Sequence, residues 1–292
     1  MTPVSPGYRT RPAAGPYRGG VTTISSTPTR DQLRAHLLTS RIAGEVATTR
    51  QNNLENFGRM SRGEPLYRFG LRLTGRWSYE DVLALMAERC GVVADPAHVR
   101  GQDTIDPDLT LDRLDALADR IGLAARRQER VLIATGHPVG LRPTHIAVGR
   151  GLAAAGCTVL TAAQGWAHPD LPEYGEQSGT LDWVDRVGVL RSPSGTLKHT
   201  HSPLLMEAAL AALDTPPDLV VADHGWAGAA GEAGIDTVGY ADCNDPALFA
   251  GEAEGKVVSC VPLDDNVDPR LYLPLTAYLL DRVGLSAGRL SS

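Results

Sequence analysis

The hydrophobic positions of the chain follow three successive patterns. Residues 1–27 carry no apolar periodicity, hold four prolines and four glycines and contain no acid, which predicts a flexible tail. Residues 28–126 place apolar side chains at helical spacing, and residues 127–292 alternate short apolar runs with helical segments. We therefore expect a tail, a helical region and an α/β sheet domain, with the last two packed as one unit.

The helical region begins with a proline. Thr27 can cap a helix that has Pro28 in its first turn and continues towards Phe57, as one long helix or as a helix pair with Gly44 as its weak point. The far end of this segment, residues 49–57, is rich in polar side chains. These side chains could face solvent or reach into a site.

Two more helices are expected before residue 127. Ser78 and Asp81 have the spacing of a capping box, with apolar residues at helical spacing behind them. Asp108 or Thr110 can cap the second helix, whose apolar stripe extends to Ile121.

Six short apolar runs lie in the last part of the chain, separated by helical segments. The expected strands are 131–134, 158–160, 187–190, 219–222, 237–240 and 257–261. The expected helices are 143–155, 203–214, 226–233, 245–253 and 270–283. Continuous apolar strands alternating with helices are typical of parallel sheets covered on both faces. The pattern predicts a doubly wound, mostly parallel, Rossmann-like α/β fold behind the helical region.

Polar residues follow four of these strands directly. They are Thr135-Gly136-His137, Asp223-His224-Gly225, Asp242-Cys243-Asn244-Asp245 and Asp264-Asp265-Asn266. Because the carboxyl ends of parallel strands share one edge, where ligands bind in α/β proteins, we expect these side chains to lie together. The edge then concentrates carboxylates and imidazoles, which suit a divalent metal and a hydrolysed phosphate.

Carboxylates at this edge are candidate metal ligands. We assign that role to Asp223, Asp242, Asp264 and Asp265, because adjacent carboxylates repel unless a cation or a proton lies between them. Asp245 is assigned instead to capping the helix that begins with Pro246. Oxygen ligands favour Mg²⁺ or Mn²⁺, and added imidazoles would shift the preference towards Zn²⁺.

Imidazoles at the same edge are candidate acids and bases. His137 and His224 are assigned to proton transfer, with Asp223 beside them. His199 and His201 have a weaker claim, since in an extended segment they point to opposite sides and could share one metal only if the chain bends there.

Phosphate contacts are expected from glycines and cations. Gly136, Gly225 and Gly228 could present backbone N–H groups to phosphate, although tight packing explains a glycine-rich turn as well. Lys198 and Arg59 could contact the substrate.

Composition and charge exclude several partners. The formal charge is −6, without a basic stripe, which argues against nucleic acid. No apolar run reaches the roughly 20 residues that span a bilayer. The four cysteines lie far apart, so we expect reduced thiols and a cytoplasmic protein. A helix pair ahead of an α/β sheet leaves a homodimer open.

Several phosphatase and hydrolase devices are absent from the sequence. There is no Cys-x5-Arg loop, Arg-His-Gly motif or Walker A loop, and Asp242-Cys-Asn-Asp245 misses the DxDx[TV] pattern by its spacing. What remains is attack by water on a phosphoester, assisted by a metal.

Five sequence blocks carry a resemblance to a known family. They are Ile133-Ala-Thr-Gly-His-Pro138, Ala222-Asp-His-Gly-Trp-Ala-Gly228, Tyr240-Ala-Asp-Cys-Asn-Asp-Pro246, Val261-Pro-Leu-Asp-Asp-Asn-Val267 and Arg50-Gln-Asn-Asn-Leu54. With these blocks the chain resembles an actinobacterial phosphatase family over roughly residues 30–283. The resemblance implies phosphatase activity and brings no substrate or catalytic residue with it.

The leading hypothesis is a metal-dependent phosphomonoesterase that acts on a small phosphorylated metabolite. The alternative is a protein that binds a sugar phosphate or nucleotide, or isomerises it, without hydrolysis. A protein-interaction role for the helical half is a third hypothesis, and it leaves the acidic edge unexplained.

Overall fold

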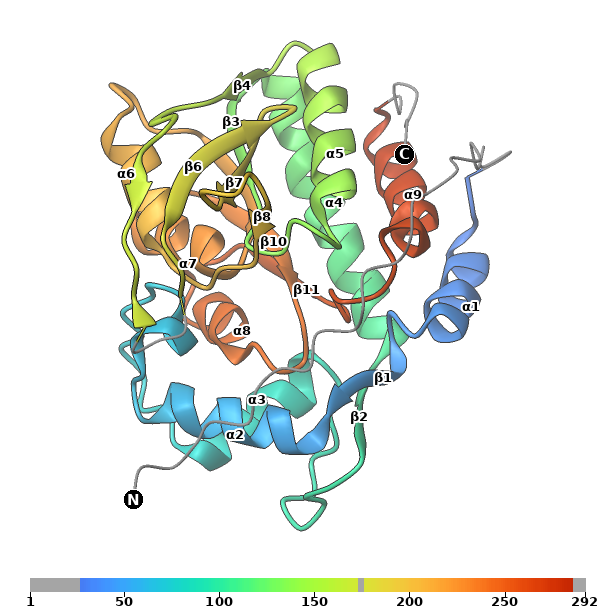
Figure 1. Cartoon of the computed structure of the whole chain (residues 1–292). Helices are drawn as coiled ribbons and strands as arrows, with labels where there is room; N and C mark the ends of the chain where they lie inside the picture. The colour runs from blue at the N-terminus through green and yellow to red at the C-terminus, as the bar shows by residue number, and fades with distance from the viewer. Residues whose placement is uncertain (1–26, 173–175, 286–292) are drawn as a thin grey trace.

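A computed structural model describes residues 27–172 and 176–285 (Figure 1). The predicted tail therefore lies outside the described residues, apart from Thr27. Within the described ranges, no helix has both the length and the apolar character needed to cross a membrane.

A nine-stranded sheet forms the centre of the molecule. Across the sheet the strands are β11 (Ser259–Pro262), β10 (Thr237–Ala241), β9 (Leu219–Asp223), β3 (Arg130–Ala134), β7 (Val187–Arg191), β6 (Gly179–Val184) and β5 (Ala167–His168). In addition, β4 (Thr158–Leu160) pairs with β3, and β8 (Leu197–Lys198) pairs with β7. The prediction of an α/β protein with a mostly parallel sheet is confirmed.

The six predicted strands are the parallel ones. Strands β4, β7 and β9 pair in parallel with β3, and β10 and β11 extend the parallel order. Strands β5, β6 and β8 are antiparallel and were not predicted. Two of them are only two residues long, and β6 is partly exposed, so none carries a continuous apolar run.

Two groups of helices pack on the sheet. In the first, α4 (Pro107–Arg127) contacts β10 and β11, α5 (Arg142–Ala154) contacts β3, β4 and β7, and α9 (Leu273–Val283), which follows η3 (Pro269–Tyr272), packs on both helices. In the second, α7 (His224–Glu232) contacts β9 and β10, α8 (Pro246–Ala253) contacts β11, and α6 (Leu204–Ala211) packs on α7.

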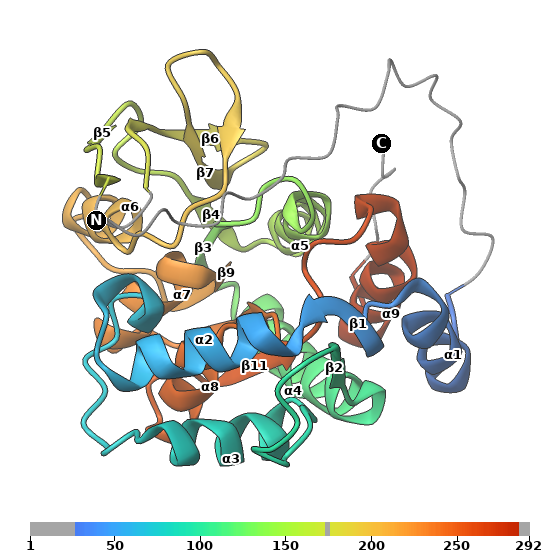
Figure 2. The same cartoon turned by 60° about the horizontal axis from the view of Figure 1, so that its bottom comes forward.

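The N-terminal region adds further helices and a small sheet. Its helices are α1 (Arg30–Ser40), α2 (Arg50–Ser61), η1 (Pro65–Arg68) and α3 (Tyr79–Arg89). Between α1 and α2, β1 (Gly44–Thr49) pairs antiparallel with β2 (Gln102–Ile105), so a strand separates the expected helix pair. Figure 2 shows β1 leading into α2, which packs on α3 and α8. This packing brings residues 47–56 to the sheet.

Helix capping agrees with the sequence at one position and differs at two. Ser78 and Asp81 form the predicted capping box of α3. Helix α1 is capped by Thr29 instead of Thr27, because Gln32 completes a capping box there. Helix α4 is capped by Asp106 instead of Asp108 or Thr110, because Pro107 occupies the first helical position.

The register of the parallel strands aligns their carboxyl ends. Ala241 of β10 pairs with Pro262 of β11, and Tyr240 pairs with Asp223 of β9. Ile133 of β3 pairs with Val221 of the same β9. The segments that follow these four strands therefore emerge at one edge of the sheet.

Candidate active site

The aligned strand ends bring the predicted polar residues together. His137, His224, Asp245 and Asp265 have charged or ring atoms within 4 Å of another member of this set. The segment after β8 joins them, because the Thr200 N–H donates a hydrogen bond to the Gly136 carbonyl oxygen, 3.0 Å away. Residues from five strand ends therefore share one site.

His224 has an unusual backbone conformation at the start of α7. Its φ is 49°, in the left-handed region that side chains other than glycine rarely adopt. In this conformation its Nδ1 lies 2.8 Å from Asp223 Oδ1, and both residues are buried. Strained backbone at a polar site is typical of functional positions.

Asp223 makes the contacts of a residue that orients others. The Gly136 N–H donates to its Oδ1 at 2.7 Å, so this oxygen serves both Gly136 and His224. Its Oδ2 lies 3.7 Å from His145 Nε2 and has no hydrogen-bond partner among the described residues.

Charge favours a protonated His224. Burial opposes a charge on the ring, but the hydrogen bond to Asp223 and the charges of Asp245 and Asp265 outweigh it and raise the pKa of His224 to about 10. For Asp223, burial is likewise outweighed by the hydrogen bond from His224, and its pKa is lowered. The two side chains form a buried ion pair.

Three imidazoles gather around His224. The ring centroid of His199 lies 4.9 Å from that of His224, and the centroid of His201 lies 5.0 Å from it. The centroid of His137 lies 4.8 Å from that of His199. His199 and His201 thus face one site, with their ring centroids 4.9 Å apart, instead of pointing to opposite sides.

His137 is a neutral member of this group. Burial and the positive charge of His224 lower the pKa of His137 to about 4, against the opposing charge of Asp223. Its Nε2 lies 3.7 Å from Asp265 Oδ1, and its Nδ1 is buried without a hydrogen-bond partner in the described part of the chain.

Three carboxylates form the other end of the site. Asp242 accepts a 2.6 Å hydrogen bond from the Thr48 hydroxyl, and Asp264 accepts one of 3.2 Å from the Ala47 N–H. Burial and the charge of Asp264 raise the pKa of Asp242 to about 7, although the Thr48 bond opposes this. Burial raises the pKa of Asp265 well above its usual range. Buried carboxylates with raised pKa values are typical of cation or proton sites.

Asp245 does not cap α8 with its side chain. It occupies the N-cap position, but no side-chain capping hydrogen bond forms within the described structure. Its Oδ2 lies 3.4 Å from His224 Nε2 instead, and burial raises its pKa to about 6 against the charge of His224. The capping role assigned to Asp245 from the sequence is therefore wrong.

Three groups of side chains have the spacing of a metal site, with ligand atoms within 4.8 Å of one another. They are His199, His201 and His224; His224, Asp245 and Asp265; and Asp242, Asp264 and Asp265. Three of the four predicted ligands belong to these groups, and Asp223 does not. The sequence analysis assigned Asp245 to helix capping. Its position at a strand end was the one signal that could have indicated a metal-binding role.

The predicted phosphate contacts are glycines and cationic side chains. The glycines are in close contact with other backbone segments: a Cβ on Gly225 would lie 2.3 Å from the His201 carbonyl oxygen. The Gly136 N–H is already bonded to Asp223. The glycine-rich segment is the first part of α7, not a free turn, and close packing explains its composition.

Gly228→Ala is expected to lower the melting temperature. Its Cβ would lie 2.0 Å from the Phe69 carbonyl oxygen, and overpacking of this kind typically costs about 1–3 kcal/mol. Gly58→Ala in α2 is the matched control, since the nearest atom there is the end of the Arg62 side chain. Thermal denaturation measures both variants. An unchanged melting temperature with weakened phosphate affinity in Gly228→Ala would favour the phosphate-cradle interpretation instead.

The two predicted cationic residues are connected to the imidazoles indirectly. Arg59 donates a 2.7 Å hydrogen bond to the Tyr67 hydroxyl and pairs with Glu55, and the Tyr67 ring lies edge-on to His201. Lys198 ends β8, one residue before His199.

The polar residues at the start of α2 reach the site. This was one of the two possibilities predicted for residues 49–57. Asn56 donates a hydrogen bond to the Asn244 carbonyl oxygen, and the Asn244 side chain donates to Asn52 Oδ1. Asn53 contacts Cys243 Sγ at 3.3 Å. Thr48, the residue that contacts Asp242, lay just outside the predicted stretch.

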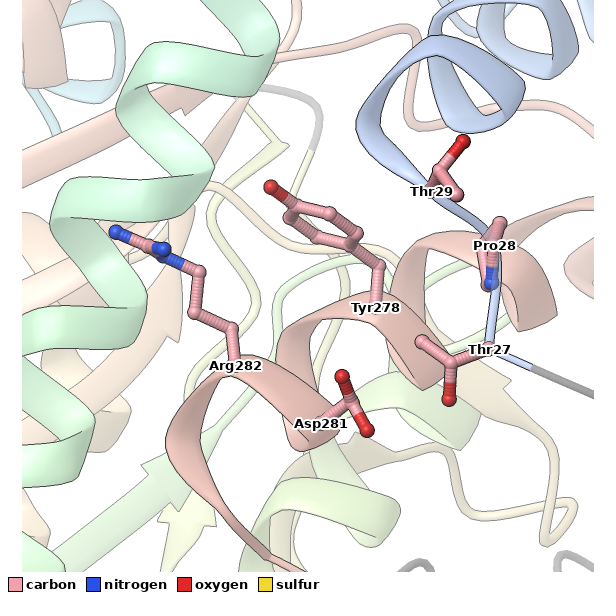
Figure 3. A pocket seen from close by; sticks show the side chains of 6 residues that line it. All are labelled: Thr27, Pro28, Thr29, Tyr278, Asp281 and Arg282. Carbon is pink, nitrogen blue, oxygen red and sulfur yellow. The ribbon is translucent and has the colours of Figure 1, made fainter.

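A pocket of about 370 Å³ lies elsewhere, where α9 meets the start of α1 (Figure 3). Tyr278, Asp281 and Arg282 line it from α9, and Thr27, Pro28 and Thr29 line it from the N-terminal side. None of these six residues belongs to the His and Asp groups of the site.

The chain is similar to known proteins over most of its length. The chain matches the sequence profile of a family described as Phosphatase over residues 28–287. It is also similar to a Streptomyces coelicolor protein named Phosphatase SCO2771, with 48% identity over 268 residues. The alignment covers 90% of this chain and 99% of that relative.

Proposed function

This chain belongs to the phosphatase family and is a phosphatase, and on that premise we propose that it hydrolyses phosphomonoesters of small metabolites with the help of a divalent metal ion. The predicted resemblance to an actinobacterial phosphatase family is confirmed. The metal dependence rests on one observation, the groups of imidazoles and carboxylates that converge at the edge of the sheet.

The residues of the site fit a divalent cation. Asp242, Asp264 and Asp265 supply oxygen ligands, which Mg²⁺ and Mn²⁺ prefer, and His224 beside Asp245 would also accommodate Zn²⁺. A cation bound there supplies polarisation of a phosphoryl oxygen and a lower pKa for water.

Asp223 acts, in this proposal, by orienting His224 instead of binding the cation. Its Oδ1 accepts the Nδ1–H of His224, which directs Nε2 towards Asp245 and Asp265. Around metal centres, the second ring nitrogen of a metal-binding histidine commonly donates a hydrogen bond to a carboxylate. On binding the cation, His224 would release the proton on Nε2. The proton on Nδ1 would stay there, in its hydrogen bond to Asp223.

His137 is the candidate for proton transfer. With its pKa lowered to about 4, the ring is neutral at neutral pH and can accept a proton. Arg59 and Lys198 lie beside the imidazole end and could meet the phosphate of a substrate, as expected from the sequence.

The remaining parts of the proposal concern fold class, location and assembly. The step from β3 to β4 and the step from β9 to β10 run in opposite directions across the sheet. Right-handed crossovers then put α5 and α7 on opposite faces, which supports a doubly wound, Rossmann-like class. A cytoplasmic location and a homodimer complete the proposal.

Removal of divalent metal is expected to abolish phosphate release, and Mg²⁺, Mn²⁺ or Zn²⁺ is expected to restore it. The substrates to use are p-nitrophenyl phosphate and a panel of sugar and nucleotide phosphates, before and after dialysis against EDTA. Circular dichroism checks that the dialysed protein is folded. Full turnover in folded, metal-free protein would refute the metal dependence, and binding of a sugar phosphate without turnover of any substrate would favour the non-hydrolytic alternative.

A further inference from the structure

The metal-binding groups of the site form a continuous series. His224 belongs to both the first and the second group, and Asp265 belongs to both the second and the third. The series runs from His199 and His201 at one end to Asp242 and Asp264 at the other. These seven donor residues exceed what one tetrahedral or octahedral ion with bound water takes from a protein.

The two ends of the series differ in chemistry. One end offers three imidazoles, with His199 exposed, His201 half-buried and His224 buried. Imidazole nitrogens suit Zn²⁺, Fe²⁺ or Mn²⁺. The other end offers three buried carboxylates, which suit Mg²⁺ or Mn²⁺. One side of the series is therefore open to solvent and the other is enclosed.

Asp265 lies between the two ends. It is 5% exposed, and its Oδ2 lies 3.7 Å from His224 Nε2 with no hydrogen-bond partner among the described residues. An unpaired buried carboxylate oxygen is costly unless a cation or a proton binds it. Asp265 is thus positioned to contact ions at both ends of the series.

The charges of the site also suit more than one cation. Asp242, Asp245, Asp264 and Asp265 are all buried. In the described ranges, none of these four has a lysine or arginine nitrogen within 4 Å. When all four are ionised, a single divalent ion offsets two of their negative charges, and two divalent ions offset all four.

We propose that the site binds two divalent cations, one among His199, His201 and His224 and one among Asp242, Asp264 and Asp265, with Asp265 between them. This inference rests on the proposed metal dependence and adds the stoichiometry and the division of ligands. Paired metals that clamp the attacking and leaving oxygens are a general solution for phosphoester hydrolysis.

The test uses Mn²⁺ and the full chain. Metal-free protein is loaded with Mn²⁺, freed of excess metal by gel filtration, and its manganese content is measured by mass spectrometry. We expect two equivalents per chain and an electron paramagnetic resonance spectrum with exchange coupling between neighbouring ions. His199→Gln and Asp242→Asn, one at each end, are each expected to retain one equivalent and to lose the coupling.

A matched control and three contrary outcomes complete the test. Asp108→Asn replaces an exposed carboxylate that pairs with Arg34, and it is expected to retain both equivalents and the coupling. One equivalent in the wild type, with turnover that depends on Mn²⁺, would overturn the second ion and leave the proposed function standing. Two uncoupled equivalents would overturn the shared role of Asp265. No bound Mn²⁺ with full turnover would overturn both proposals.

Discussion

His224→Asn is expected to lower kcat/KM by about 10²-fold or more, because it removes a proposed metal ligand and even the outer partners of such ligands contribute about 10–100-fold. The ring of His224 contacts Asp223 through Nδ1 and faces Asp245 and Asp265 through Nε2. Among His137, His199, His201 and His224, the described structure gives only His224 a hydrogen bond to Asp223. Asparagine is chosen because it tolerates the left-handed backbone conformation, φ 49°, better than most residues.

The measurement is steady-state kinetics with p-nitrophenyl phosphate at saturating Mn²⁺, together with thermal denaturation. His168→Asn is the control, because His168 is 2% exposed, as His224 is, and belongs to none of the described metal-binding groups. The control variant is expected to keep the wild-type kcat/KM. If His224→Asn folds and retains more than a third of that value, His224 has no role in the reaction.

Asp242→Asn is expected to raise the melting temperature of the metal-free protein at pH 8 and to remove most of its activity. Asp242 is buried among other carboxylates, so its charge destabilises the fold when no cation is bound. Each pKa unit corresponds to about 1.4 kcal/mol, and about 1 kcal/mol moves the melting temperature by roughly 2–4 °C in a chain of 150–250 residues. We expect an increase of at least about 2 °C on that basis.

The pH dependence of this gain has a definite sign. The pKa of Asp242 is raised from 3.8 to about 7 in the folded protein. A group with a raised folded pKa stabilises the fold below its unfolded pKa, and this stability is lost as the pH rises through the folded value. The advantage of Asp242→Asn is therefore absent below about pH 4, grows with pH, and is complete above about pH 7.

Differential scanning calorimetry in EDTA between pH 5 and pH 8 measures the effect. Asp108→Asn serves as the control, since Arg34 lowers the pKa of Asp108 and loss of that carboxylate brings no gain. Added Mn²⁺ is expected to stabilise the wild type more than Asp242→Asn, because binding to the folded state raises its stability. A lower melting temperature for Asp242→Asn at pH 8 in EDTA would contradict the repulsion argument.

The parallel part of the sheet could be predicted from local pattern. A strand that is buried on both faces must be apolar at every position, so β3, β9 and β10 read as continuous apolar runs. The antiparallel strands could not be predicted in this way. Strand β1 alternates buried and exposed residues over only six positions and gains its partner, β2, from a segment about fifty residues away.

The site, too, was predicted from the sequence only in part. Sequence alone determined that carboxylates and imidazoles would follow strands whose carboxyl ends share one edge of a sheet. Only the tertiary structure decided which side chains meet. Asp245 could cap its own helix or face His224, and contacts between distant segments settled the choice. The bond from Thr48 to Asp242 joins residues 194 positions apart, and spacing along a chain carries no information about such contacts.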